Sequence, residues 1–142
     1  MLRALLCLIL LTVPSAADPL RLPGGTSVAL PGTDLTVSLT DVTDARCPHD
    51  VDCIWEGTIR LELTVRGADT PPQTLVICNI CEGATRSAAV AGLTLTLAGL
   101  EPSTADLAAL NRPARLADYT APVTVILTLA PTGGPQETSP KG

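Results

Sequence analysis

Residues 59–66 read IRLELTVR, and this stretch decides the fold class. Every odd position is apolar and every even position is polar. Because a β-strand points successive side chains to opposite faces, this alternation predicts a strand with one buried face and one solvated face. A helix would instead repeat its apolar positions every three or four residues. The stretch therefore favours an antiparallel β fold.

The same alternation recurs between segments rich in Pro, Gly and Asp, which are typical of turns. We expect further strands at residues 27–30, 35–40, 74–78, 87–90, 93–97 and 123–129. Residues 103–111, STADLAALN, instead predict one short helical turn after a Ser or Thr cap. The chain is therefore predicted to be all-β, an antiparallel β-sandwich or small barrel of about seven short strands.

The N-terminus has the pattern of a secretory signal peptide. Residues 1–17, MLRALLCLILLTVPSAA, place one Arg before an apolar run and small residues after it. The apolar run, residues 4–13, is too short to span a bilayer, so we expect cleavage after Ala17 rather than a membrane anchor. We then expect a single β domain at 18–130 and a disordered tail at 131–142, in a periplasmic or secreted protein.

Composition excludes several classes of function. The net charge of −5 becomes −6 once Arg3 is removed, and the one Lys is Lys141, so nucleic acid and anionic membrane are poor partners. One Trp, one Tyr and no Phe cannot form a row of rings for stacking sugars or bases, and they imply an aliphatic core. The chain has no Gly-rich phosphate loop and no Gly-x-Ser-x-Gly motif. We therefore expect neither catalysis nor a cofactor.

Four cysteines remain after signal cleavage, namely Cys47, Cys53, Cys78 and Cys81. An even number in an exported chain predicts disulfides, and of the three possible pairings we favour the two local ones. Cys78 and Cys81 must then lie on a turn, since an extended strand holds such residues about 10 Å apart. A redox Cys-x-x-Cys at this pair is an alternative. A four-thiolate zinc site is disfavoured by the spacing of the first pair.

Residues 46–57, RCPHDVDCIWEG, form the most distinctive motif of the chain. It resembles a family of small bacterial exported proteins and lipoproteins that carry Arg-Cys-Pro-x-x-Val-x-Cys-x-Trp-x-Gly on one β domain. The resemblance extends over most of the mature chain, and it implies an exported β domain without implying an activity. The matching residues are Arg46, Cys47, Pro48, Val51, Cys53, Trp55 and Gly57.

A structural role explains this motif without a ligand. A Cys47–Cys53 bridge would close a loop that Pro48 stiffens. Trp55 has the same parity as Ile59, so we expect its ring in the core, as the one large side chain of an aliphatic interior. Gly57 would allow a bend or bulge where the strand leaves the loop.

The functional alternative rests on the acidic residues of segment 41–56. Several carboxylates on one loop suit Ca²⁺, but the spacing of an EF-hand is absent, and a solvated acidic loop explains them equally. We therefore interpret the protein as a non-catalytic binding or structural domain, whose partner is unknown and whose possible binding loop includes His49. A calcium-type envelope protein and a thiol-disulfide protein using Cys78 and Cys81 are the alternatives. The acidic residues are Asp41, Asp44, Asp50, Asp52 and Glu56.

Overall fold

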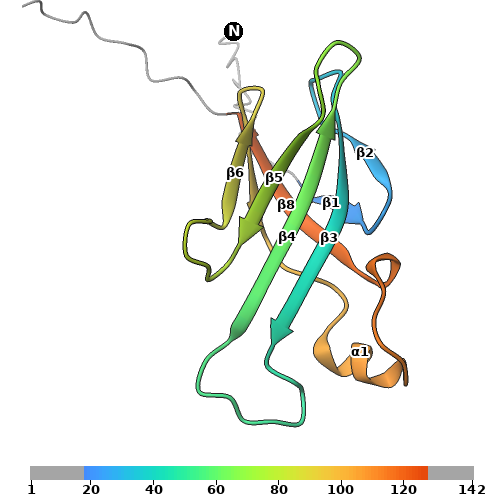
Figure 1. Ribbon diagram of the computed structural model, residues 1–142, viewed down its shortest axis with the longest axis vertical. Helices are drawn as coiled ribbons and strands as arrows, with labels where there is room; N and C mark the ends of the chain where they lie inside the picture. The colour runs from blue at the N-terminus through green and yellow to red at the C-terminus, as the bar shows by residue number, and fades with distance from the viewer. Residues whose placement is uncertain (1–17, 128–142) are drawn as a thin grey trace, which may run out of the picture.

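The computed structural model describes residues 18–127, which form eight strands, a short helix and a 3-10 turn (Figure 1). β6 and β7 have the expected bounds, β2 is one residue shorter, the other expected strands are longer or shifted, and β1 is additional to the seven expected. The elements are β1 (Leu20–Pro23), β2 (Ser27–Ala29), β3 (Thr36–Arg46), β4 (Gly57–Arg66), β5 (Gln73–Cys78), β6 (Ser87–Val90), β7 (Leu93–Leu97), α1 (Thr104–Ala109), the 3-10 turn Leu116–Asp118 and β8 (Thr120–Leu127).

The strands form two four-stranded antiparallel sheets, which confirms the predicted sandwich architecture and not the closed-barrel alternative. One sheet has the order β1-β8-β7-β6 and the other β2-β3-β4-β5. β1 was not predicted because it is only four residues long and lies between two prolines. Pro19 precedes it and Pro23 is its last residue, so its sequence resembles that of a turn. Pairing with β8, with Leu22 opposite Ala121, makes it a strand.

The core lies between the two sheets and is aliphatic except for Tyr119, largely as the composition predicts. Leu61 and Leu63 of β4 face Leu95 and its neighbours from the other sheet, and these three side chains are completely buried. Among residues 18–127 no polar or charged residue is fully buried. The apolar residues of the alternating segments therefore form the interior of the sandwich.

A β-bulge divides β3 into two halves with opposite parity. Leu39 pairs with Leu63, whereas Asp41 pairs with Glu62, so Thr40 is the extra residue. An extra residue exchanges the two faces of a strand. Beyond the bulge, the even-numbered residues from Val42 onward are the half-buried ones, and β3 continues to Arg46 instead of ending near residue 40. The outer part of the β3–β4 hairpin extends past the other strands as an arm (Figure 1).

The predicted helical turn is confirmed as α1, between β7 and β8. Ser103 caps it, since its hydroxyl accepts a hydrogen bond from the backbone N–H of Asp106 at 3.2 Å. The segment that leads into α1 lies against the arm of the β3–β4 hairpin, because Arg46 at the end of β3 donates hydrogen bonds to the carbonyls of Leu100 and Pro102. The predicted signal peptide, residues 1–17, and tail, residues 131–142, lie outside the described residues.

Candidate functional site

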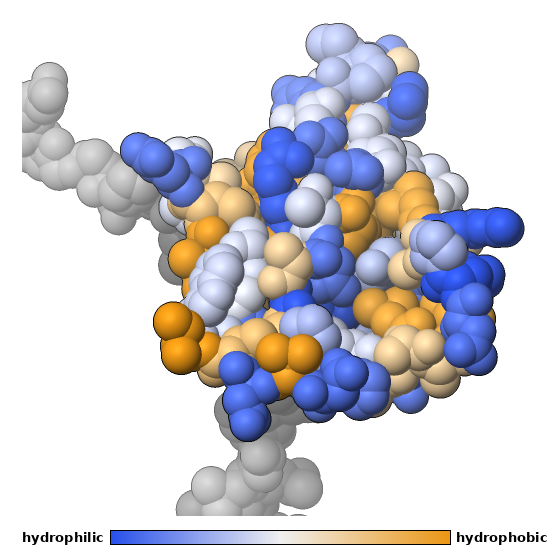
Figure 2. Space-filling view, turned by 60° about the horizontal axis from the view of Figure 1, so that its bottom comes forward, coloured by the Kyte–Doolittle hydropathy of each residue, from blue (hydrophilic) through white to orange (hydrophobic). Residues whose placement is uncertain are grey.

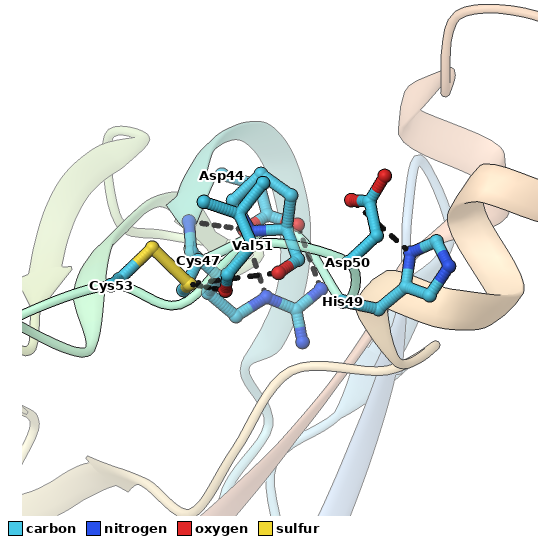
Figure 3. The surroundings of a disulfide bond; sticks show 8 residues. Asp44, Cys47, His49, Asp50, Val51 and Cys53 are labelled. Atoms are coloured by element: carbon cyan, nitrogen blue, oxygen red, sulfur yellow. Dashed lines mark hydrogen bonds and ion pairs between the residues drawn. A yellow bond between two sulfur atoms is a disulfide. The ribbon is translucent and has the colours of Figure 1, made fainter.

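The loop of residues 47–56 lies at the end of the arm and is closed by a disulfide. Arg46 and Gly57 are the last paired residues of β3 and β4. Cys47 and Cys53 are joined with their Cα atoms 5.9 Å apart, as the sequence predicts. Figure 3 shows this disulfide on one side of the loop and His49 facing Asp50 on the other, with His49 Nδ1 3.9 Å from Asp50 Oδ1.

Backbone hydrogen bonds restrain the loop. The N–H of Cys47 donates to the carbonyl of Glu56 at 3.4 Å, which continues the strand pairing by one step. The N–H of Val51 donates to the carbonyl of Pro48 at 3.2 Å and closes a turn within the disulfide ring. The loop is therefore constrained at its base and within its ring.

Arg46 fixes the arm to the segment that precedes α1. Its Nε and Nη2 donate to the two carboxylate oxygens of Asp44, at 2.8 and 2.7 Å. Nη1 and Nη2 also donate to the carbonyls of Leu100 and Pro102, both at 2.9 Å. Only 16% of the Arg46 side chain and 7% of the Asp44 side chain are exposed. The planar guanidinium thus connects two segments more than fifty residues apart in the sequence.

Burial and hydrogen bonding act in opposite directions on the pKa of Asp44. Burial raises the pKa of this carboxyl, but hydrogen bonds from Arg46 and from Tyr119 outweigh it, so the pKa lies below its ordinary value. Burial also raises the pKa of the Tyr119 phenol, and the negative charge of Asp44 raises it further. Asp44 is thus ionised at neutral pH and its charge is neutralised by Arg46, which gives the Arg of the motif a structural role.

The prediction that Trp55 lies in the core is wrong. Its side chain is 58% exposed. The reason is Gly57, which has a φ of +83° and interrupts the extended backbone, so the parity of β4 does not reach back to residue 55. A Cβ atom at Gly57 would lie 2.3 Å from the carbonyl oxygen of Ala45, so no other residue fits this turn. The bend expected at Gly57 is present.

Exposed apolar side chains gather on the loop. Ile54 is fully exposed and half of Val51 is exposed, in addition to Trp55; we call these three residues the apolar tip. Of the six large hydrophobic residues exposed within residues 18–127, three form the apolar tip and a fourth, Ile80, lies in the neighbouring turn. Figure 2, which brings this end of the molecule forward, shows hydrophobic side chains among strongly hydrophilic ones.

The second disulfide, Cys78–Cys81, supports the base of the loop through Asn79. The Cα atoms of the two cysteines are 5.8 Å apart on a turn, as the sequence predicts. The side-chain amide of Asn79 donates to the carbonyl of Gly57 at 3.1 Å and its oxygen accepts from the N–H of Ile59 at 2.7 Å. Cys78 itself is 1% exposed. Two disulfides fit an oxidising environment outside the cytoplasm.

The carboxylates of segment 41–56 do not converge. Asp44 is directed toward Arg46 in the interior, Asp41 pairs across the sheet with Glu62, and the loop carboxylates are exposed to solvent. Within residues 18–127 no three side chains of His, Cys, Asp or Glu come close enough together to hold a metal ion. The described geometry thus gives the calcium alternative no support.

Comparisons of the chain with protein-family models, with curated proteins and with solved structures gave no match. Within the part of the chain that the structure describes, no helix has the length and apolar character needed to cross a membrane.

Proposed function

We propose that this protein is a non-catalytic binding module of an oxidising compartment outside the cytoplasm, the periplasm or the cell exterior, and that loop 47–56 is its binding surface. The observation that carries the proposal is the exposure of Trp55 and Ile54 on a constrained loop. Exposed apolar surface costs free energy in water, and clustered exposed apolar residues commonly mark interaction sites. Trp is also among the residues that contribute most to binding at protein interfaces.

The construction of the loop supports binding rather than simple chain connection. The Cys47–Cys53 disulfide, the Arg46 hydrogen bonds and the contacts of Asn79 all restrain the backbone around the apolar tip. A surface that is already ordered loses less conformational entropy when a partner binds. The module therefore presents the apolar tip in a conformation that is ready to bind.

Three features support the proposed location. The first 17 residues have the pattern of a signal peptide that would be removed after Ala17. Each of the two disulfides is formed between cysteines close in sequence, and such bridges persist where thiols are not kept reduced. The resemblance of residues 46–57 to the motif of exported proteins leads to the same expectation.

Affinity capture from the extracytoplasmic fraction of the host tests this function. The bait is the mature chain, compared with the double variant Ile54→Ser/Trp55→Ala. The matched control is Ile126→Ser, since Ile126 is 54% exposed but lies on β8, away from the loop. We expect proteins that are retained by the wild type and by the control but lost with the double variant. Identical retained sets for all three baits would contradict the proposal.

A further inference from the structure

We infer that the partner of loop 47–56 is a protein segment that carries Lys or Arg next to an apolar side chain. This inference rests on the proposed function, and it names the chemistry of the partner from the charges that surround the apolar tip. Asp50, Asp52 and Glu56 all lie within the loop and all are exposed. The surface therefore combines apolar groups with negative charge.

No positive side chain neutralises these three carboxylates within residues 18–127. Arg46 precedes the loop but turns inward and uses its guanidinium on Asp44 and on two carbonyls. Arg60, which follows the loop in the sequence, pairs with Glu62 instead. His49 lies 3.9 Å from Asp50 and carries a charge only when it is protonated. Three like charges on a short loop repel one another, and a positive group on a partner relieves that repulsion.

The same charges argue against other occupants. A second copy of this chain would bring an identical set of carboxylates against the first, and an anionic membrane or nucleic acid would be repelled in the same way. A cationic segment fits because its positive charge complements the carboxylates and its apolar neighbour covers Ile54. The ring face of Trp55 adds attraction, since Lys and especially Arg stack favourably on an indole.

A random dodecapeptide library displayed on phage tests this inference on the oxidised mature chain. We expect the selected peptides to be enriched in Lys and Arg beside Leu, Ile, Val or aromatic residues. Synthetic versions of these peptides should bind more weakly as salt is raised from about 50 to about 500 mM, because screening weakens attraction between charges. Titration by calorimetry or anisotropy gives the affinities.

Two charge-matched triple variants separate the contribution of the loop from that of net charge. Asp50→Asn/Asp52→Asn/Glu56→Gln neutralises the loop, whereas Asp18→Asn/Asp34→Asn/Asp69→Asn removes three charges outside it. Asp18 precedes β1, Asp34 lies between β2 and β3, and Asp69 lies between β4 and β5. The β2–β3 and β4–β5 connections are at the opposite end of the molecule from the loop (Figure 1). We expect the loop variant to lose at least about tenfold in affinity and the control to change less than about threefold.

The outcomes also distinguish this inference from the proposed function. Peptides that lose binding on Trp55→Ala but are insensitive to salt and to the loop charges would overturn the cationic partner and leave the binding function in place. Selection of peptides without Lys or Arg would do the same. Peptides that bind Trp55→Ala as tightly as the wild type would overturn both, because the apolar tip would then have no part in recognition.

Discussion

Gly57 determines the environment of Trp55, although the two residues are not adjacent. Because its φ is +83° and the carbonyl oxygen of Ala45 lies where a Cβ atom would clash, Gly57 imposes a turn that only glycine adopts without strain. The strand alternation therefore begins after the turn and includes Ile59 and Leu61 but not Trp55. The one Trp of the chain is thus available for binding instead of packing.

Trp55→Ala is expected to lower the free energy of unfolding by less than about 1 kcal/mol, because most of the ring is already in water. Leu95→Ala, at a completely buried position of β7, should instead cost about 2–5 kcal/mol. Urea denaturation of the two variants measures both values.

The tryptophan fluorescence of the native protein tests the exposure of Trp55 directly. Its emission should be red-shifted and easily quenched by a soluble quencher. Blue-shifted emission that is protected from the quencher would show that the ring is buried.

Arg46→Ala is expected to destabilise the fold by about 2–3 kcal/mol, since it leaves the shielded Asp44 carboxylate and two carbonyls without their donor. Arg46→Lys should recover little, because an ammonium cannot reproduce the planar arrangement of donors. Arg60→Ala is the control, as the Arg60–Glu62 pair is more than one-third exposed and contributes under about 1 kcal/mol. Equal losses for Arg46→Ala and Arg60→Ala would contradict the anchoring role.

The lowered pKa of Asp44 predicts how stability depends on pH. A carboxyl whose pKa is lower in the folded state stabilises the fold above its unfolded pKa, about 3.9, and this contribution is lost as the pH falls through the folded-state value. Asp44→Asn should therefore be less stable than the wild type at pH 7, and the difference should shrink below about pH 4. Urea titrations between pH 7 and pH 2.5 test this; a difference that grows with acid would contradict it.

At the scale of elements, the two halves of the β3–β4 hairpin have different structural roles. Its inner half contributes Val37, Leu39, Leu61 and Leu63 to the core. Beyond the bulge at Thr40 its outer half forms the arm. Arg46 joins the arm to the segment before α1, and the disulfide-closed loop lies at its end. The bulge allows one strand pair to contribute both to the core and to the arm that carries the proposed binding loop, because it changes which side chains face inward.

The double variant Cys47→Ser/Cys53→Ser tests the contribution of the loop closure. A closure this short should stabilise the fold by about 2 kcal/mol in the chain-entropy model, so the variant should unfold at lower urea concentration but remain folded in water. Binding of a loop-specific peptide should weaken as well, because the apolar tip is no longer constrained. Unchanged affinity together with lower stability would show that the ring serves only the fold.

The whole molecule consists of an aliphatic sandwich with different surfaces at its two ends. The loop end bears the apolar tip and three exposed carboxylates, and both disulfides lie near it. The space between the sheets is filled mainly by side chains of Leu, Val and Ile, with Tyr119 as the aromatic member of the core. The apolar tip and the three loop carboxylates lie outside this core, so their substitution should leave its packing intact.

Protein isolated from its native source should have the intact mass of a chain that starts at Asp18, with two disulfides. Alkylation without prior reduction should label none of its four cysteines, since Cys78 is buried and all four are paired. The same treatment after reduction under denaturing conditions is the positive control. A mass that includes Met1, or label on two or more cysteines, would contradict the proposed export.

The sequence by itself determined the antiparallel β class and the mainly aliphatic core, predicted a Ser or Thr cap before the helical turn, and favoured the two local disulfides among three possible pairings. These features depend on residues near one another in the chain, where alternation, capping and short loop closure act directly. Only the tertiary structure decided the direction of Trp55, the extent of β3 and the role of Arg46. Each of these depends on a local departure from regular strand geometry or on a contact with a distant segment: the left-handed turn at Gly57, the extra residue at Thr40, and carbonyls more than fifty residues away. A regular period contains no information about such departures. The sequence therefore indicated the loop as a possible binding segment, whereas the exposure of Trp55 on it was decided only by the tertiary structure.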